Sequence, residues 1–131
     1  MERERASQEF DTGQAARPLT VLVVEDDPDA RETLGVVLEM DGLRVIGAAT
    51  VAAALAAGHS EASIDLLVTD LTLPDGRGDT VALALEQRHP SMRSIFLSGG
   101  PELALNPRQR YLSKPARMGA ILREVHALLE A

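Results

Sequence analysis

Short apolar runs and segments of helical periodicity alternate along this chain. The apolar runs are rich in β-branched residues and nearly continuous, as strands are when a parallel sheet buries both of its faces. The intervening segments repeat apolar residues every three or four positions, which indicates amphipathic helices. We therefore expect an α/β fold with helices on both faces of the sheet. The strands are expected at residues 19–24, 43–48, 64–69, 94–98 and 110–113.

Capping and turn-forming residues mark where the helices begin and end. Asp27 is a good N-cap for the first helix, because its carboxylate can accept hydrogen bonds from free N–H groups of the first turn. Asp41 and Gly42 end that helix, and Thr50 caps an alanine-rich one. Proline and glycine make residues 71–78 a loop. The helices are expected at residues 28–40, 51–58, 79–89 and 116–130, with Gly78 as an alternative start of the third.

The interval between the fourth and fifth strands is too short for a full helix of the usual length. Proline interrupts a helix because it lacks an N–H and clashes with the preceding turn. Pro101, Asn106 and Pro107 stand in this interval and leave room for about one helical turn. We therefore expect the helix between these two strands, the fourth helix, to be short or absent.

Composition and charge exclude several classes of protein. The 131 residues contain no cysteine, which excludes disulfides, thiolate catalysis and cysteine-ligated zinc. A net charge of −7 disfavours unaided binding to nucleic acid or anionic lipid. No secretory signal and no apolar run of about 18 residues is found, so we expect a cytoplasmic protein without membrane contact. Residues 1–17 are polar and are expected to form a flexible tail or linker, followed by one domain at residues 18–131.

Chemically reactive side chains follow the ends of the expected strands. In an open parallel sheet, ligands bind at the carboxyl ends of the strands. The reactive residues at these ends are Glu25, Asp26, Asp70, Ser98 and Lys114, the single lysine of the chain. Neighbouring carboxylates repel one another unless a cation is present, and oxygen ligands favour Mg²⁺ over zinc. Such a site suits phosphoryl transfer, in which a carboxylate attacks while cations neutralise the phosphoryl oxygens.

Four sequence motifs at these strand ends resemble the signatures of bacterial response-regulator receiver domains. They read VLVVEDDP at residues 21–28, DLTLPDG at 70–76, FLSG at 96–99 and YLSKP at 111–115. The resemblance extends over residues 19–131, with the motifs in the family's order. It implies a CheY-like, flavodoxin-like doubly wound parallel sheet of five strands in the order 2-1-3-4-5. The shortened fourth-helix region is similar to that of receivers attached to hybrid sensor kinases.

The resemblance implies a phosphoacceptor and a metal site. Asp70 corresponds to the aspartate that takes a phosphoryl group from a histidine kinase or a histidine phosphotransfer protein. Glu25 and Asp26 correspond to the acidic pair that binds Mg²⁺, together with Asp70 and the backbone carbonyl of Thr72. Helix capping is the alternative for the acidic pair, but Asp27 is the better-placed cap. Turn capping is the alternative for Asp70, and it poorly explains an acid at the end of an apolar strand.

The resemblance also implies a catalytic lysine and two switching residues. Lys114 corresponds to the lysine that contacts the phosphoryl oxygens, and its bond to Pro115 is cis in this family. Ser98 corresponds to the hydroxyl residue that moves toward the phosphoryl group, and Tyr111 to the aromatic residue that changes rotamer with it. A small strand-end residue is the alternative for Ser98, and simple packing is the alternative for Tyr111.

Structural roles are expected for the remaining polar candidates. Asp75 is expected to belong to its turn rather than to the metal site. All three histidines are expected on the surface rather than in catalysis: His59, His89 and His126. A basic group is interpreted as a solvated face, with a docking edge as the alternative; it consists of Arg108, Arg110 and Arg117.

The sequence therefore predicts a signalling domain rather than a turnover enzyme. It is expected to catalyse only its own phosphorylation and dephosphorylation, as a monomer or weak dimer. A receiver-like scaffold that signals by protein binding without phosphorylation is the alternative. A small phosphatase with an aspartate nucleophile is disfavoured, because it would need a second acid where Thr72 stands. Small residues at Thr72 and Gly100 predict an open phosphorylation site, and the readout surface is expected on the fifth strand and last helix.

Overall fold

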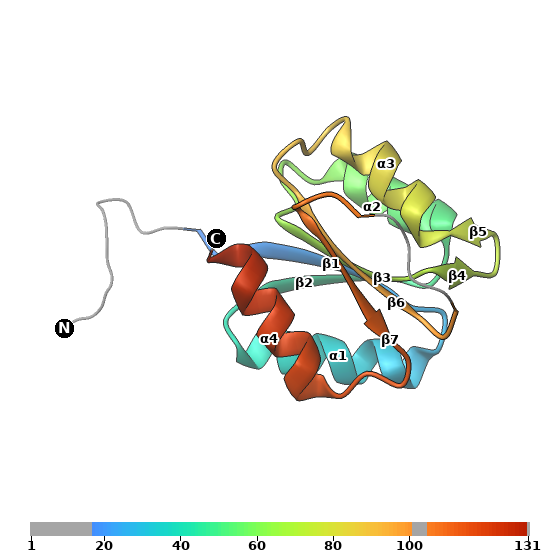
Figure 1. The fold of residues 1–131 in the computed structure, drawn as a ribbon. Coiled ribbons are helices and arrows are strands. Elements are labelled where there is room, and N and C mark those ends of the chain that lie inside the picture. The colour runs from blue at the N-terminus through green and yellow to red at the C-terminus, as the bar shows by residue number, and fades with distance from the viewer. Residues whose placement is uncertain (1–16, 101–104, 131) are drawn as a thin grey trace.

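Five parallel strands form the central sheet. The computed structural model describes residues 17–100 and 105–130. The strands of this sheet are β1 (Thr20–Val24), β2 (Arg44–Ala48), β3 (Leu66–Asp70), β6 (Arg93–Ser98) and β7 (Gln109–Ser113). They lie in the order β2-β1-β3-β6-β7, and neighbouring strands are parallel throughout (Figure 1). When the five parallel strands alone are numbered by their order in the sequence, this order is 2-1-3-4-5. The expected doubly wound topology is therefore confirmed.

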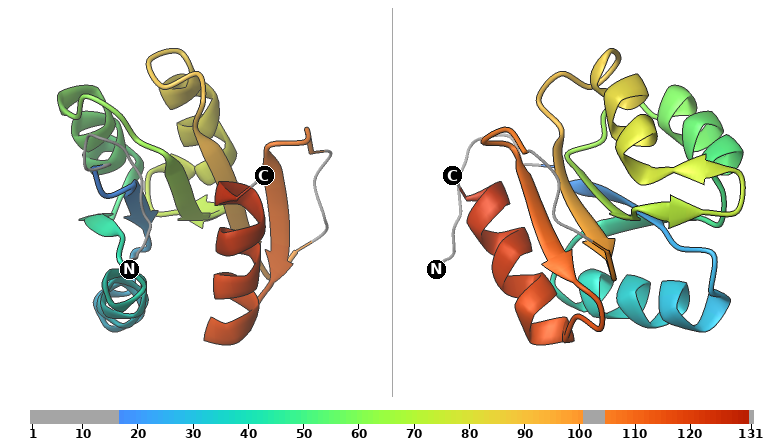
Figure 2. Two further views of the ribbon diagram at one scale, coloured as in Figure 1. Left: turned by 90° about the vertical axis from the view of Figure 1, so that its left-hand side faces the viewer. Right: turned by 45° about the vertical axis from the view of Figure 1, so that its right-hand side comes forward.

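Helices cover both faces of the sheet, as its continuous apolar strands predict. In the described residues these are α1 (Pro28–Met40), α2 (Val51–Ser60), α3 (Gly78–Glu86) and α4 (Met118–Leu129). The pair α1 and α4 lies on one face, and the pair α2 and α3 lies on the other (Figures 1 and 2). None of these described helices is long and apolar enough to cross a membrane.

Alternate residues of each strand enter two separate cores. Val21 and Val23 of β1 pack beneath α1 and α4, whereas Leu22 and Val24 pack beneath α2 and α3. The residues of β3 and β6 divide in the same way, and Phe96 is the largest side chain in the core beneath α2 and α3. This burial on both faces is the reason that the strands form unbroken apolar runs in the sequence.

The helix boundaries follow the expected capping residues. The Asp27 carboxylate accepts a hydrogen bond from the Asp29 N–H at 3.2 Å, and the Thr50 hydroxyl accepts one from the Ala53 N–H at 3.0 Å. Gly42 follows α1 with a φ of 93°, in the left-handed region that favours glycine. These contacts fix the orientation in which α1 and α2 leave the strand ends.

The segment expected as a loop at residues 71–78 contains a small hairpin. Its strands, β4 (Thr72–Leu73) and β5 (Gly76–Arg77), pair in the antiparallel direction. The expected loop therefore contains a hairpin that the sequence did not predict, because strands of two residues leave no periodic pattern. Leu73 is buried in the core beneath α2 and α3, which holds the hairpin against the domain.

The connection from β6 to β7 is not helical in the residues that the structure describes there, 99–100 and 105–108. The expectation of a short or absent helix between these strands agrees with this; residues 101–104 lie outside the described residues. Beside the connection, α3, β6 and β7 border a groove of about 300 Å³ whose lining includes Leu83, Phe96 and Leu105.

Arg17 ties the start of the described chain to the sheet. Its guanidinium donates two hydrogen bonds to the Asp65 carboxylate, at 2.9 and 3.1 Å. The same carboxylate accepts a hydrogen bond from the Thr20 N–H at 2.8 Å. The expectation of a flexible tail falls on residues 1–17, of which 1–16 lie outside the described residues. Arg17 itself is bound to the domain.

His89 is buried, and its expected place on the surface was wrong. Helix α3 ends at Glu86, so His89 lies in the turn beyond it, with only 4% of its surface exposed. Its Nδ1 accepts a hydrogen bond from the Ile64 N–H at 3.1 Å, and its Nε2 lies 2.6 Å from the Gly58 carbonyl oxygen. These partners require a neutral ring that donates through Nε2. His89 therefore joins the turn after α3 to the end of α2 and to the loop between α2 and β3.

Replacing His89 with alanine should destabilise the domain substantially. The substitution leaves a buried N–H and a buried carbonyl without partners, and each costs about 1–3 kcal/mol. We expect His89→Ala to lower the free energy of unfolding by about 3 kcal/mol in a urea titration. The exposed His59 is the matched control, and His59→Ala should change the free energy of unfolding by no more than about 0.5 kcal/mol. Equal effects of the two variants would contradict the structural role of His89.

Candidate functional site

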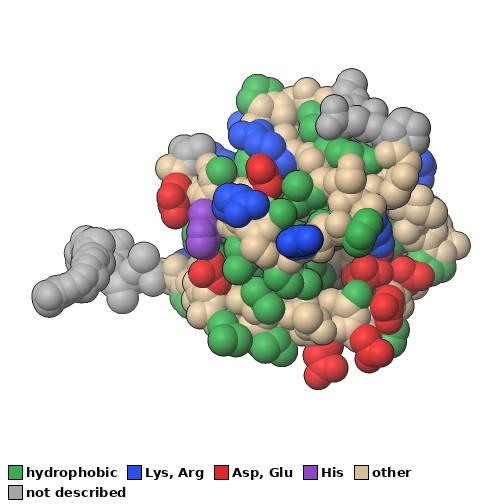
Figure 3. Space-filling view, turned by 60° about the horizontal axis from the view of Figure 1, so that its bottom comes forward, with side chains coloured by type: hydrophobic (Ala, Val, Ile, Leu, Met, Phe, Trp, Pro, Cys, Tyr) green, Lys and Arg blue, Asp and Glu red, His purple; other side chains and the backbone are tan. Residues whose placement is uncertain are grey.

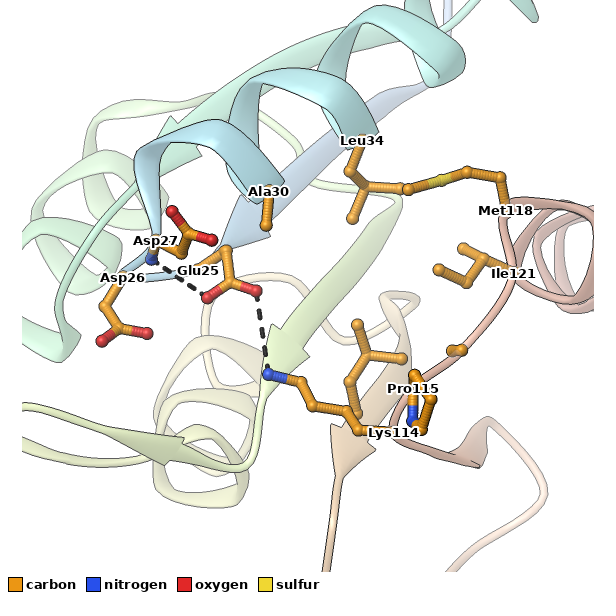
Figure 4. A pocket seen from close by; sticks show the side chains of 11 residues that line it. Glu25, Asp26, Asp27, Ala30, Leu34, Lys114, Pro115, Met118 and Ile121 are labelled. Carbon is orange, nitrogen blue, oxygen red and sulfur yellow. Dashed lines mark hydrogen bonds and ion pairs between the residues drawn. The ribbon is translucent and has the colours of Figure 1, made fainter.

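The carboxyl ends of β1, β3 and β7 bring the expected charged residues together. Oxygen atoms of Glu25, Asp26 and Asp70 lie within 4.8 Å of one another. Lys114 joins them from the end of β7, and its Nζ is 2.7 Å from Asp70 Oδ1 and 3.8 Å from Glu25 Oε1. Figure 4 shows the Lys114 side chain extending toward Glu25 across the mouth of a pocket. The topology of the sheet thus places three acids and the lysine in one site.

Burial makes this cluster electrostatically demanding. Asp70 is 3% exposed and Glu25 is 9% exposed, whereas Asp26 lies on the surface. Asp70 Oδ1 is a buried oxygen that accepts no hydrogen bond from the described residues, so its polar contact there is the ion pair with Lys114. Lys114 is a single charge shared with the neighbouring Glu25, so it does not neutralise both buried carboxylates, and a further cation would balance the cluster.

The pKa values of Glu25 and Lys114 are both shifted by the burial and the charges of this cluster. Burial raises the pKa of Glu25 above its usual value, and the neighbouring Asp70 carboxyl raises it further. Burial alone would lower the pKa of Lys114, but its contacts with Asp70 and Glu25 outweigh this and raise it. One ammonium therefore faces two largely buried carboxyls. The donor set is entirely oxygen, which fits a hard divalent cation such as Mg²⁺.

Backbone contacts hold Glu25 in place. Its N–H donates to the Ala48 carbonyl at 3.0 Å, and its carbonyl accepts a hydrogen bond from Arg31 Nη1 at 2.8 Å. The Arg31 side chain lies over Gly47, where a Cβ would be 3.4 Å from Arg31 Cδ. Arg31 was not among the residues predicted from sequence, because an arginine on the first helix carries no local sign that it contacts the neighbouring strand end.

Close packing behind Asp70 fixes the start of the following loop. A Cβ at Gly78 would overlap the Asp70 carbonyl oxygen, so glycine is required at this position. The Gly78 N–H donates to the Leu71 carbonyl at 2.9 Å, and the Leu71 N–H donates to the Leu97 carbonyl at 2.9 Å. Thr72, whose backbone carbonyl is a candidate metal ligand, follows directly and begins β4.

Hydrogen bonds join Ser98, at the end of β6, to Tyr111, in the middle of β7. The Ser98 hydroxyl accepts a hydrogen bond from the Gly100 N–H at 2.9 Å. The Tyr111 hydroxyl donates to the Ser98 carbonyl at 3.3 Å and also contacts the Gly100 carbonyl. The Lys114 N–H donates to the Ser98 carbonyl at 2.8 Å, and the Lys114–Pro115 bond is cis, as the resemblance implies. Tyr111 and Lys114 thus both donate a hydrogen bond to the Ser98 carbonyl.

A groove of about 380 Å³ leads from the acidic cluster between α1 and α4. Its walls are apolar and include Ala30 and Leu34 of α1 and Met118 and Ile121 of α4 (Figure 4). Figure 3 shows the corresponding face of the molecule, with apolar side chains gathered near its centre and acidic ones at one end. The cluster is therefore open to a partner that presents both apolar and charged groups.

The remaining candidates take structural positions. Asp27 caps α1, as expected, and Asp75 caps α2 from the tip of the hairpin rather than lying in the acidic cluster. Arg110 pairs with Glu124 at 3.4 Å, and Arg108 donates to the Pro90 carbonyl. The basic group is thus partly engaged in contacts within the domain.

Comparison with known proteins decides the family. A family model described as the response regulator receiver domain matches residues 21–126. The chain belongs to this family. It is 30% identical over 117 residues to the response regulator receiver protein CpdR of Brucella abortus, covering 85% of this chain and 97% of that protein.

Solved receiver structures are similar in fold. The receiver domain of the hybrid histidine kinase CckA is 25% identical, with a TM-score of 0.74, and covers 84% of this chain and 98% of its own. A response regulator from Burkholderia pseudomallei is 27% identical, with a TM-score of 0.70, and covers 83% of this chain and 71% of its own. That protein was solved with a phosphorylated aspartic acid, a calcium ion and citrate. Receiver domains of hybrid kinases are thus among the relatives of this chain.

Neutralising Glu25 should stabilise the metal-free receiver at neutral pH. Because the pKa of Glu25 is raised on folding, the folded state binds its proton more tightly than the unfolded state. Stability is therefore lost as the pH rises from the ordinary value of 4.5 through the raised one. We expect Glu25→Gln to raise the midpoint of thermal unfolding at pH 7 by a few degrees, and the difference to vanish near pH 4.

Magnesium supplies the control for this prediction. Mg²⁺ should raise the unfolding midpoint of the wild type, because it relieves the repulsion between the carboxylates. It should have little effect on Glu25→Gln, which lacks one of the three charges. A variant that is less stable than the wild type at pH 7 would show that Glu25 is not electrostatically strained.

Proposed function

We propose that this receiver accepts a phosphoryl group on Asp70 in a Mg²⁺-dependent two-component phosphorelay. The observation that carries the proposal is the buried Asp70 carboxylate, which is paired at 2.7 Å with Lys114 and lies beside Glu25 and Asp26. A receiver of 27% identity that carries a phosphorylated aspartic acid and a calcium ion gives further support. The domain is a signalling module that catalyses only its own phosphorylation and dephosphorylation.

The chemistry follows from the placement of these charges. A carboxylate oxygen of Asp70 attacks the phosphorus of a phosphohistidine, forming an O–P bond as the P–N bond breaks. The released electron pair returns to the imidazole nitrogen. Glu25, Asp26 and Asp70, with the backbone carbonyl of Thr72, would hold Mg²⁺, which supplies positive charge opposite the phosphoryl oxygens. Lys114 releases its contact with Asp70 and pairs with a phosphoryl oxygen instead.

The phosphodonor that we propose is a histidine kinase or a histidine phosphotransfer protein. The hybrid kinase CckA, whose receiver is similar in fold, supports this kind of partner. The groove between α1 and α4 opens beside the acidic cluster, and its apolar walls suit a protein partner. A net charge of −7 argues against direct binding to nucleic acid. We propose a cytoplasmic domain that makes no membrane contact and acts as a monomer or weak dimer.

Phosphorylation is proposed to switch the surface formed by β7 and α4. The added charge draws the Ser98 hydroxyl and Lys114 toward Asp70. Ser98 would then release the Gly100 N–H, and Tyr111 would lose its hydrogen bonds to the Ser98 and Gly100 carbonyls. Since β7 carries Tyr111 and leads into α4, these two elements are the ones that respond.

Incubation with acetyl phosphate and Mg²⁺ tests the function directly. Intact-protein mass spectrometry should show the gain of one phosphoryl group in the wild type and none in Asp70→Asn. No gain in either protein, with native folding verified by circular dichroism, would favour a receiver-like scaffold that does not use phosphate. Continuous hydrolysis of phosphate esters at a rate far above self-phosphorylation would favour a phosphatase. Both of these results contradict the proposal.

The phosphorylated form should be short-lived. Thr72, Gly99 and Gly100 are small and exposed beside the acidic cluster, so water can reach a phosphoryl group on Asp70. After removal of the phosphodonor, the phosphoryl group should be lost within minutes in the presence of Mg²⁺, as followed by mass spectrometry. Persistence for many hours would show that the site is shielded.

Lys114→Arg should impair phosphorylation while preserving the fold. The lysine ammonium is a compact point charge 2.7 Å from Asp70, whereas the guanidinium is larger, planar and presents its donors in a fixed fork. We expect the rate of phosphorylation by acetyl phosphate to fall by about tenfold or more, with a thermal midpoint close to that of the wild type. An unchanged rate would show that phosphorylation needs a positive charge at this position but not the compact shape of an ammonium group.

A further inference from the structure

Asp75 links the loop that follows Asp70 to the N-terminus of α2. Its Oδ1 accepts a hydrogen bond from the Val51 N–H at 2.7 Å, and its Oδ2 accepts one from the Ala52 N–H at 3.0 Å. Both oxygens of the side chain are therefore used by a helix that precedes it by more than twenty positions in the chain. These backbone hydrogen bonds lower the pKa of Asp75, so the carboxylate stays charged.

The contact anchors the tip of the β4–β5 hairpin, which lies beside α2 in Figure 1. Gly76 at the tip lies close to Val51, where a Cβ would be 3.1 Å from Val51 Cγ2. The base of the hairpin is fixed separately, because the Gly78 N–H donates to the Leu71 carbonyl. Thr72 lies between the fixed base and the anchored tip.

We propose that Asp75 is a positioning residue for the metal site, because it holds the hairpin so that the Thr72 carbonyl faces the acidic cluster. The proposal rests on the proposed function, in which Thr72 supplies a backbone ligand to Mg²⁺. A backbone ligand has no side chain to reorient, so its position depends on how the hairpin is anchored. Residues that orient metal ligands commonly change affinity by 10- to 100-fold when they are removed.

Helix capping alone does not account for this contact. The Thr50 hydroxyl already caps α2 by accepting a hydrogen bond from the Ala53 N–H at 3.0 Å. Thr50 directly precedes the helix and lies outside the hairpin, whereas Asp75 belongs to the hairpin itself. Both side chains accept hydrogen bonds from N–H groups at the N-terminus of α2. Of the two, Asp75 is the one that connects this helix to the hairpin that carries Thr72.

This difference supplies a matched pair of variants, Asp75→Ala and Thr50→Ala. Each removes a side-chain cap of α2 and should lower the unfolding free energy, Asp75→Ala by the loss of two hydrogen bonds and Thr50→Ala by the loss of one. Mg²⁺ alone is the probe, and its affinity is measured from shifts of backbone amide resonances in the full chain. We expect Asp75→Ala to weaken Mg²⁺ binding by about tenfold and Thr50→Ala by less than about twofold. Asp75→Asn keeps one acceptor oxygen, so its Mg²⁺ affinity should lie between those of the wild type and Asp75→Ala.

Amide hydrogen exchange gives a second readout that needs no metal. In Asp75→Ala the amides of residues 71–77 should exchange at least about tenfold faster than in the wild type, whereas Thr50→Ala should accelerate exchange in α2 without affecting the hairpin. Equal losses of Mg²⁺ affinity in Asp75→Ala and Thr50→Ala, or unchanged hairpin exchange in Asp75→Ala, would overturn the positioning role. A wild type without saturable Mg²⁺ binding would instead refute the proposed function, and the exchange result would still decide whether Asp75 anchors the hairpin.

Discussion

The ion pair between Lys114 and Asp70 is the interaction on which the site depends. It joins the ends of β7 and β3 at 2.7 Å, where Asp70 is almost completely buried. Burying a carboxylate is costly unless a charged partner satisfies it, and one lysine cannot satisfy both Asp70 and Glu25. The folded receiver therefore retains an excess of negative charge at this point. A divalent cation would remove that excess, and a phosphoryl group would give Lys114 a new partner.

The fold explains how such an unfavourable cluster is tolerated. Two separate apolar cores lie on either side of the sheet, and their burial stabilises the strands independently of the charges at their ends. Backbone contacts then fix the loops that carry the acids: Arg31 holds the carbonyl of Glu25, and Gly78 packs against the carbonyl of Asp70. The scaffold is rigid where the acids are placed and open where a partner would approach.

Much of this architecture could be predicted from the sequence, because it depends on local patterns. Apolar strands and capping residues predicted the parallel sheet, the resemblance to receiver domains implied its strand order, and the parallel topology placed Asp70 and Lys114 at the same edge. Contacts between a side chain and a distant backbone group could not be predicted in this way. His89 turns into the core beyond a helix that ends early, and Asp75 caps a helix that lies far away in the sequence. Such contacts depend on the tertiary arrangement and leave no periodic signal.

A magnesium titration followed by backbone amide resonances tests whether the buried charges form a cation site. In the wild type we expect saturable shifts that centre on Glu25, Asp26 and residues 70–72. The Lys114 amide should also respond, because its side chain contacts Asp70. Asp70→Asn should lose most of this response. Absence of saturable shifts, or the same shifts and affinity in Asp70→Asn, would show that these carboxylates do not form a cation site.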